Sequence, residues 1–269
     1  MENKNNEEVT KTNKNKCLLS GVCLLAGDPD YCYDMCPSYI GMHGVSGKSG
    51  RVGSANAPKE YRLVTLENSP AKKNQPAIYR ELAKYARSFN RMFDENETND
   101  PLLRIKNHYF YSKNTGTGKT TTACALLNEY LIRHYTLSIK QGKQPLNMPA
   151  FYLDVNDWQG LYNKLTRPDV PSELKEEAGA KYYQRMKYAK TAPFVVMDDI
   201  GVRDATDAFK SDLLNIINER INNHLITVYT SNIPMDALQE VYGERLWDRA
   251  RDLTRPIDFE GNSKRGNRL

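Results

Sequence analysis

The chain has 269 residues, of which 38 are lysine or arginine and 33 are aspartate or glutamate, so its formal charge is +5. Hydrophobic residues make up 39% of the chain, enough to bury a core, which excludes collagen, coiled coils and fully disordered chains. The longest apolar stretch, residues 17–26, is too short to cross a bilayer as a helix, so we expect no membrane partner and a cytoplasmic location. Lysines before this stretch would also fit a signal peptide, but its two cysteines argue against that.

The N-terminal part divides into three segments by composition. Residues 1–16 are rich in lysine, asparagine and glutamate, which predicts a disordered tail. Residues 17–60 comprise a Cys-rich head (17–43) and a linker rich in glycine, serine, alanine and asparagine (44–58). Residues 61–100 form a connecting segment, with apolar residues at helical spacing from residue 76 to residue 93.

The head contains four of the five cysteines of the chain. In a cytosolic protein, paired cysteines near a chain end indicate zinc ligands more readily than disulfides, and zinc would stabilise a segment too small for its own core. Unliganded reduced thiols remain the alternative. The fifth cysteine, Cys124, is most simply a small core residue. The favoured zinc ligands are Cys17, Cys23, Cys32 and Cys36, with His43 as a substitute.

Residues 101–269 alternate between apolar runs typical of strands and stretches with helical spacing. Strands are predicted at 105–111, 151–155, 194–197 and 225–230; helices are predicted after residue 118, at 157–165, at 172–190 and through residues 209–221, followed by short terminal helices. Strands separated by helices predict an α/β fold with a parallel sheet covered on both faces.

A glycine-rich loop lies between the first predicted strand and its helix, in the sequence YSKNTGTGKT that ends at Thr120. Gly116 and Gly118 would turn backbone N–H groups toward phosphate oxygens, Lys119 would reach the β- and γ-phosphates, and Thr120 would bind Mg²⁺. Lys113 replaces the first glycine of this motif, so the loop must start without a residue suited to positive φ. The residues expected to hold the nucleotide are Asn114, Thr115, Gly116, Thr117, Gly118, Lys119, Thr120 and Thr121.

Two carboxylates follow the buried strand FVVM, in the sequence DDIG. Ligand sites of parallel sheets lie at the carboxyl ends of the strands, so Asp198 should reach Thr120 and Mg²⁺, and Asp199 should face the attacking water. Two adjacent acids at a buried strand end are costly without a cation.

Together these motifs resemble the AAA+ class of P-loop ATPases, and within it the DnaC/DnaI type of replicative helicase loader. The resemblance runs from about residue 61 to the C-terminus and rests on the P-loop, the DDIG strand end, the sequence TSN at 230–232, and the sequence GERLWDRAR at 243–251. It implies an ATPase core that uses ATP and Mg²⁺ and lacks the C-terminal helical lid of most AAA+ proteins. It also supports zinc, because several loaders carry a small metal-bound N-terminal domain.

The resemblance also implies roles for single residues. Asn232 matches sensor 1, which helps hold the hydrolytic water and the γ-phosphate. Arg249, with Arg245 as second choice, matches the arginine finger that one subunit offers to the nucleotide of its neighbour, and Arg265 matches the sensor 2 arginine. Most AAA+ strands end in Asp-Glu, whereas Asp199 has the shorter side chain, so we expect slow hydrolysis.

One further segment, KYYQRMKYAK at residues 181–190, interleaves aromatic and basic residues, a composition that favours single-stranded DNA. Initiator relatives carry an added helical element at this place. A solvated amphipathic helix whose tyrosines pack inward is the alternative.

The resulting hypothesis is an ATP-dependent loader of a hexameric DnaB-type replicative helicase, of bacterial or phage origin, that assembles with copies of itself and contacts single-stranded DNA. One alternative is a transposition-helper ATPase of the IstB type, which acts on duplex DNA. The other is an adaptor that binds nucleotide without hydrolysing it.

Overall fold

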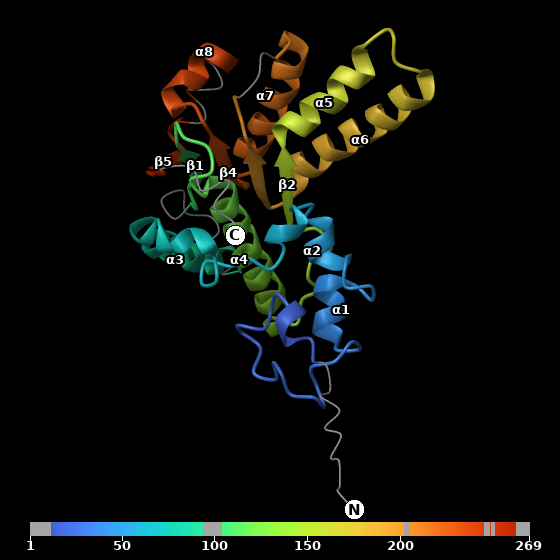
Figure 1. Ribbon diagram of the computed structural model, residues 1–269, viewed down its shortest axis with the longest axis vertical. Coiled ribbons are helices and arrows are strands. Elements are labelled where there is room, and N and C mark those ends of the chain that lie inside the picture. Colours follow the sequence, from blue (N-terminus) through green and yellow to red (C-terminus); the bar gives the residue numbers. More distant parts are fainter. Residues whose placement is uncertain (1–11, 94–103, 202–204, 245–247, 249–250, 262–269) are drawn as a thin grey trace, which may run out of the picture.

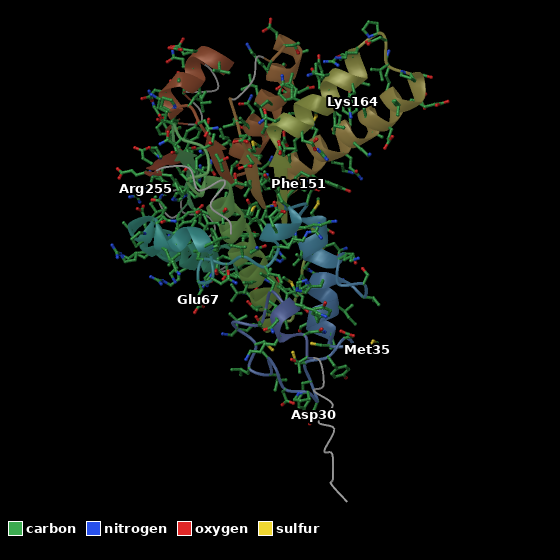
Figure 2. The ribbon with its side chains drawn as sticks, in the orientation of Figure 1. Asp30, Met35, Glu67, Phe151, Lys164 and Arg255 are labelled. Atoms are coloured by element: carbon green, nitrogen blue, oxygen red, sulfur yellow. The ribbon has the colours of Figure 1, made fainter. Side chains whose placement is uncertain are left out.

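The computed structural model describes residues 12–93, 104–201, 205–244, 248 and 251–261. These residues form one elongated molecule whose Cys-rich head lies at one end of the long axis (Figure 1). The helices α5 (Val155–Thr166) and α6 (Ser172–Thr191) lie toward the other end. Figure 2 labels Asp30 and Met35 at the head end and Lys164 at the opposite end. Within the described ranges, every helix is too short or too polar to cross a membrane.

A five-stranded sheet forms the centre of the fold, in the order β2-β3-β4-β1-β5, and all neighbouring strands are parallel. This confirms the predicted α/β fold with a parallel sheet. The strands are β1 (Asn107–Tyr111), β2 (Ala150–Asp154), β3 (Phe194–Asp198), β4 (Ile226–Ser231) and β5 (Thr254–Asp258).

The last strand, β5, lies in a region for which only short helices were predicted. It contains Pro256, which has no backbone N–H and therefore suits an edge strand, where one side of the backbone is unpaired. The short helices are also present, as η6 (Met235–Ala237) and α8 (Leu238–Tyr242), before the strand.

The two faces of the sheet are covered by different helices. On one face α4 (Lys119–Lys140) packs on alternate strand residues such as Tyr152, Val196 and Val228. On the other face α5 (Val155–Thr166), α6 (Ser172–Thr191) and α7 (Asp207–Asn222) cover the residues in between. The alternation follows from the two-residue period of a strand and buries both faces.

The N-terminal part packs along α4. Its helices are α1 (Pro37–His43), α2 (Gly50–Ser54) and α3 (Pro76–Ser88), with the short 3₁₀ helices η1 (Lys14–Lys16), η2 (Lys59–Tyr61), η3 (Pro70–Lys73) and η4 (Phe89–Phe93). Helix α3 and η4 lie where the spacing of apolar residues predicted a helix.

The segment 44–58, predicted as a linker, is part of the core. It contains α2, and Val52, Ala55 and Ala57 are buried in the same cluster as α4. The guanidinium of Arg51 donates to backbone carbonyls of α1 and of residues 145–146, and lies 5.3 Å from the ring centroid of Tyr135. Small side chains, which suggested flexibility, instead allow close packing.

A buried arginine connects the helices on the far face to the sheet. Arg220 of α7 is 1% exposed and donates hydrogen bonds to the hydroxyl of Thr227 and to the carbonyl oxygens of Ala189, Ala192 and Ile226. Burial lowers the pKa of its guanidinium to about 9. Arg220 therefore holds the end of α6 against β4.

Candidate nucleotide-binding site

The loop between β1 and α4 is shaped by two glycines at positive φ. Gly116 has a φ of 71°, and Gly118, which precedes the first residue of α4, has a φ of 100°. A Cβ atom at Gly118 would also lie only 2.7 Å from the Cβ atom of Ala71. Both the backbone conformation and the contact with η3 therefore require glycine here.

Lys113, in place of the first glycine of the motif, is not among the residues of positive φ. The loop therefore starts in a conformation open to any side chain, as predicted, and Lys113 is exposed to solvent.

Lys119 is buried at the start of α4, with its ammonium group directed into the loop. Its Nζ atom donates to Asn232 Oδ1 at 2.6 Å, to the Asn114 carbonyl oxygen at 3.2 Å and to the Ser112 carbonyl oxygen at 3.4 Å. The structure thus brings the predicted P-loop lysine and the predicted sensor residue together.

Asp198, at the end of β3, is 4% exposed and accepts hydrogen bonds from three hydroxyl groups. Thr120 Oγ1 lies 3.0 and 3.1 Å from its two carboxylate oxygens, Thr230 Oγ1 lies 2.6 Å from Oδ1, and Tyr152 Oη lies 2.7 Å from Oδ2. Burial raises the pKa of Asp198 to about 6, opposed by these hydrogen bonds and reinforced by Asp199. A cation beside Asp198 would offset the burial of its charge.

Asp199 occupies a left-handed backbone conformation, with a φ of 56°. Its N–H group donates to Thr230 Oγ1 at 3.0 Å, so the hydroxyl of Thr230 connects both carboxylate residues to β4. Aspartate and asparagine tolerate this conformation better than longer side chains do. The backbone therefore offers a physical reason for aspartate rather than glutamate here.

The residues present fit a nucleotide with Mg²⁺. The Thr117 hydroxyl is buried within the loop and has no hydrogen-bond partner among the described residues. The adjacent helix N-terminus and Lys119 supply positive charge for phosphate oxygens. Thr120 Oγ1 and the Asp198 carboxylate are oxygen ligands of the kind that Mg²⁺ prefers. When bound, Mg²⁺ would neutralise phosphate charge at this point.

The remaining predicted residues lie at the rim of the loop or outside the described part. Thr115 is exposed and Thr121 is buried, and Asn114 donates through Nδ2 to the Gly261 carbonyl oxygen at 2.9 Å. Arg245, Arg249 and Arg265 lie outside the described residues.

Two hydroxyl donors to Asp198, from Tyr152 and Thr230, were not predicted from the sequence. The alternation of strand residues between the two faces of the sheet does place Tyr152 and Thr230, like Asp198, on the face that α4 covers. The alternation alone does not show that these side chains are neighbours. That requires the strand register, which pairs Asp154 with Asp198 and Met197 with Tyr229.

The predicted zinc ligands do not form a site in the structure. Within the described residues, no group of three or more Cys, His, Asp or Glu side chains is placed to hold a metal ion. Burial raises the pKa of the Cys17 thiol, and the nearby Cys36, Cys23 and Cys32 act in the same direction. The substitute ligand His43 is buried and accepts, through Nε2, a hydrogen bond of 3.0 Å from the Leu18 N–H.

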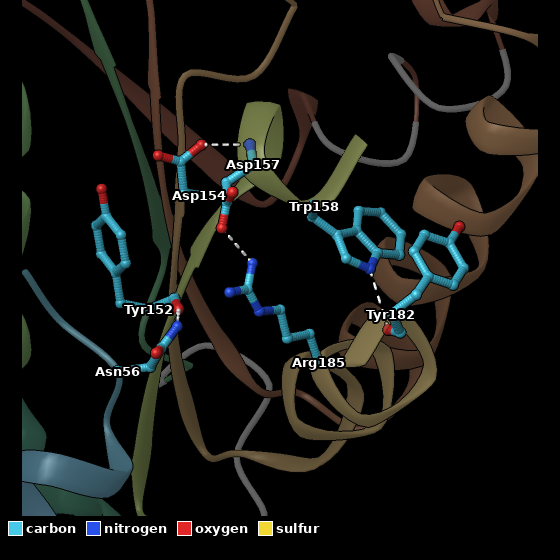
Figure 3. A network of polar contacts seen from close by, with 7 residues as sticks. All are labelled: Asn56, Tyr152, Asp154, Asp157, Trp158, Tyr182 and Arg185. Carbon is cyan, nitrogen blue, oxygen red and sulfur yellow. Dashed lines mark hydrogen bonds and ion pairs between the residues drawn. The ribbon is translucent and has the colours of Figure 1, made fainter. Parts of the chain in front are cut away.

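The basic and aromatic segment lies on α6, and its tyrosines differ in exposure. Tyr182 is 1% exposed and stacks on Trp158, with ring centroids 4.7 Å apart. Trp158 Nε1 also donates a hydrogen bond to the carbonyl oxygen of Tyr182 (Figure 3). Tyr188 packs against Phe151, whereas Tyr183 is 61% exposed. The inward packing offered as the alternative therefore holds for part of the segment, and one aromatic side chain remains available.

Comparison with known proteins gives relatives among helicase loaders. No known protein-family profile matches the chain. The chain is 24% identical over 173 residues to the replicative helicase loader DnaI of Bacillus subtilis (strain 168), covering 60% of this chain and 48% of that protein. It is 25% identical over 146 residues to the replicative helicase loader DnaC of Escherichia coli (strain K12), covering 53% and 49%.

A crystal structure of the DnaC helicase loader superposes with a TM-score of 0.50 at 18% identity, covering 76% of this chain and 100% of that one. This chain therefore has the same fold as that structure. The chain spans about half the length of the curated relatives it matches. The resemblance to DnaC/DnaI-type loaders that the motifs indicated is confirmed.

Proposed function

We propose that this chain is an ATP-dependent loader that binds a hexameric DnaB-type replicative helicase and delivers it to single-stranded DNA at replication initiation. The proposal is carried by four side chains that meet at the carboxyl ends of the strands. They are Lys119, Thr120, Asp198 and Asn232. Both named relatives are replicative helicase loaders, and this similarity supports helicase loading as the process in which the site acts.

The site supports ATP binding followed by hydrolysis. The P-loop N–H groups and Lys119 would hold the phosphates, while Thr120 and Asp198 would hold Mg²⁺. Asp199 would orient the attacking water and Asn232 the γ-phosphate. Because Asp199 has a short side chain, we propose slow hydrolysis, which suits a timed release rather than a motor.

The head offers a surface for the helicase. Large apolar side chains are exposed within residues 22–35, and we call this set the head patch. Several large apolar side chains exposed within one short segment favour a site of protein interaction. The head patch comprises Val22, Leu24, Leu25, Tyr31, Tyr33 and Met35, with exposed fractions of 47–102%.

The test is co-purification of the full chain with the replicative helicase of its host, with wild type compared with Leu24→Ser and Leu25→Ser together. Point variants are preferable to removal of residues 1–60, because removal would uncover the core that contacts Val52, Ala55 and Ala57. We expect the double variant to lose helicase binding. A matched control is Leu174→Ser on α6, where the leucine is 53% exposed.

If wild type binds no hexameric helicase, the loader proposal is wrong, and the chain must be tested against a transposase and duplex DNA. Equal binding by wild type and by the double variant would place the helicase contact away from the head patch. Magnesium-dependent ATP hydrolysis by the wild type would exclude the adaptor that binds nucleotide without hydrolysing it. The relatives named above favour a loader over a transposition helper.

The assembly and its DNA contact are part of the proposal. Arg249, or Arg245, would complete the nucleotide site of a neighbouring copy, and Arg265 would act on the nucleotide of its own chain. The exposed Tyr183 and the neighbouring cations of α6 would contact single-stranded DNA through base stacking and phosphate charge.

Zinc in the head is proposed from the cysteine spacing and from the proximity of Cys23, Cys32 and Cys36 to Cys17. Binding would require these thiols to move closer than they lie in the structure. The proposal assigns no step of the ATPase cycle to this metal.

A further inference from the structure

Tyr152 connects Asp198, the proposed Mg²⁺ ligand, to the N-terminal part of the chain. Its side chain is 4% exposed, and its hydroxyl donates to Asp198 Oδ2 at 2.7 Å. Its backbone groups point away from β3 and bond residues 55 and 56. The N–H group donates to the Ala55 carbonyl oxygen at 2.7 Å, and the carbonyl oxygen accepts from Asn56 Nδ2 at 3.0 Å. Figure 3 shows Asn56 against the backbone of Tyr152, with the tyrosine ring directed away from α5.

The backbone contacts are possible because β2 is an edge strand. Among the described strands β2 pairs only with β3, so the N–H and carbonyl groups on its outer edge need other partners. Residues 55 and 56 supply them for Tyr152. Asn56 has a φ of 60°, which turns the chain at this point.

The contact with Asp198 is suited to orient a metal ligand. The phenol donates a charge-assisted hydrogen bond in a buried environment, where such bonds are stronger than in water. It engages Oδ2, while Thr230 engages Oδ1, so the plane of the carboxylate is fixed from two strands. Outer partners of this kind typically change metal affinity by about 10-fold to 100-fold when removed.

We propose that Tyr152 is a positioning residue for Asp198, and that the segment 55–56 sets the metal affinity of the nucleotide site by fixing the backbone of Tyr152. The inference rests on the proposed nucleotide and Mg²⁺ site. It assigns Tyr152 no contact with the nucleotide. Through hydrogen bonds from Asn56 to Tyr152 and from Tyr152 to Asp198, the N-terminal part of the chain is linked to the proposed metal position.

The experiment compares Tyr152→Phe with wild type in the full chain. The first readout is the affinity for a fluorescent ATP analogue in EDTA. The second is the Mg²⁺ concentration at which the Mg²⁺-dependent increase in binding of this analogue is half complete. The third is the electron paramagnetic resonance spectrum of Mn²⁺ bound with ADP. We expect half-saturation at an about tenfold higher Mg²⁺ concentration, an altered Mn²⁺ spectrum and unchanged affinity in EDTA. A merely structural role would not separate the two affinities.

The matched control is Tyr182→Phe, because Tyr182 donates an equally long hydrogen bond of 2.7 Å to Asp212 on the far face of the sheet. Thermal unfolding in EDTA shows whether the variants fold. An increase in the half-saturating Mg²⁺ concentration no larger than in Tyr182→Phe would overturn the role of Tyr152.

The second variant, Asn56→Gly, removes the amide donor and keeps a residue suited to positive φ. We expect an increase of about threefold in the half-saturating Mg²⁺ concentration, smaller than for Tyr152→Phe because the Ala55 contact remains. Its control is Asn223→Gly at the end of α7, where the side chain also bonds a carbonyl oxygen. No change in Asn56→Gly would overturn the role of the segment 55–56. No Mg²⁺-dependent nucleotide binding by the wild type would overturn the proposed function, and this inference with it.

Discussion

The ammonium group of Lys119 donates a 2.6 Å hydrogen bond to the side-chain oxygen of Asn232. Lys119 also contacts two carbonyl oxygens of its own loop. A nucleotide that binds must replace these contacts with phosphate oxygens. In the chain without nucleotide, the Asn232 side-chain oxygen therefore occupies a hydrogen bond of Lys119 that a phosphate oxygen would take on binding.

We predict that Asn232→Ala separates binding from hydrolysis. The substitution removes a competing acceptor of Lys119, so affinity for ATP should stay within about twofold of wild type or rise, whereas the single-turnover rate should fall at least about tenfold. Lys119→Ala should instead weaken ATP binding at least about tenfold. Lys113→Ala is the control, because Lys113 is exposed and takes no special backbone conformation. A loss of binding in Asn232→Ala equal to that in Lys119→Ala would contradict the prediction.

The short carboxylate of Asp199 leads to a second prediction. Asp199→Glu should raise the single-turnover rate because the longer side chain reaches further toward the attacking water. The left-handed backbone, with φ of 56°, should make the same variant less stable by about 1 kcal/mol. Asp199→Asn should keep the stability and lose most of the hydrolysis, since asparagine tolerates this conformation. Rates and urea unfolding curves for both variants provide the check, and an unchanged rate in Asp199→Glu would show that reach does not limit hydrolysis.

Local motifs predicted much of the site, while features that depend on the sheet were missed. The P-loop, Asp198 and Asn232 follow strands at positions that the sequence reveals directly, and the structure brings them together. Tyr152 and Thr230 became visible only with the register of β2, β3 and β4. Strand β5 was missed because its five residues include proline and two charged side chains and pair with β1 from far along the chain.

The segment 44–58 shows the limit of composition as a guide. Glycine, serine and alanine are typical of flexible linkers because they lack bulky side chains. The same property lets Ala55 approach the backbone of Tyr152, and Arg51 supplies hydrogen bonds that anchor the segment. Whether small residues form a linker or a close contact depends on the surface they meet, and here that surface lies 94–96 residues further along the sequence.

Tyr183 is the residue of α6 that we expect to stack on a base of single-stranded DNA. It is 61% exposed, whereas Tyr182 is buried against Trp158. Tyr183→Ala should weaken binding of an oligonucleotide by about 1–3 kcal/mol, the usual range for one stacked base. The control is Tyr31→Ala, because Tyr31 is 57% exposed in the head, far from α6. Fluorescence anisotropy at fixed salt measures both, and equal affinities for the two variants would place the DNA contact elsewhere.

The zinc proposal predicts about one zinc ion per chain after purification without chelator. Cys32→Ser should lower the zinc content and loosen the head, measured by elemental analysis and by proteolysis of the full chain. Cys124→Ser is the control, since Cys124 is buried on α4. Wild-type protein free of zinc, with four thiols of the head reactive toward a thiol reagent, would leave reduced cysteines as the correct interpretation.

His108 should make the chain sensitive to mild acid. His108 is 3% exposed, and its ring centroid lies 4.0 Å from that of Tyr85. Its Nδ1 atom is buried and has no hydrogen-bond partner within the part of the chain that the structure describes. Burial, and then the nearby Arg255, lower the pKa of His108 to about 4. The unfolded chain, in which histidine has a pKa of about 6.5, therefore binds more protons than the folded chain between these values.

The stabilising contribution of neutral His108 is complete above about pH 6.5 and is lost as the pH falls toward 4, at about 2 kcal/mol by pH 5. The measurement is the free energy of unfolding in urea at about pH 7 and about pH 5. His43 and His134, whose pKa values are also lowered to about 4 by burial, contribute to the decrease in wild type. His108→Phe cannot titrate, so its decrease between the two pH values should be smaller by about 2 kcal/mol. An equal decrease in both proteins would show that His108 is protonated in the folded chain without loss of stability.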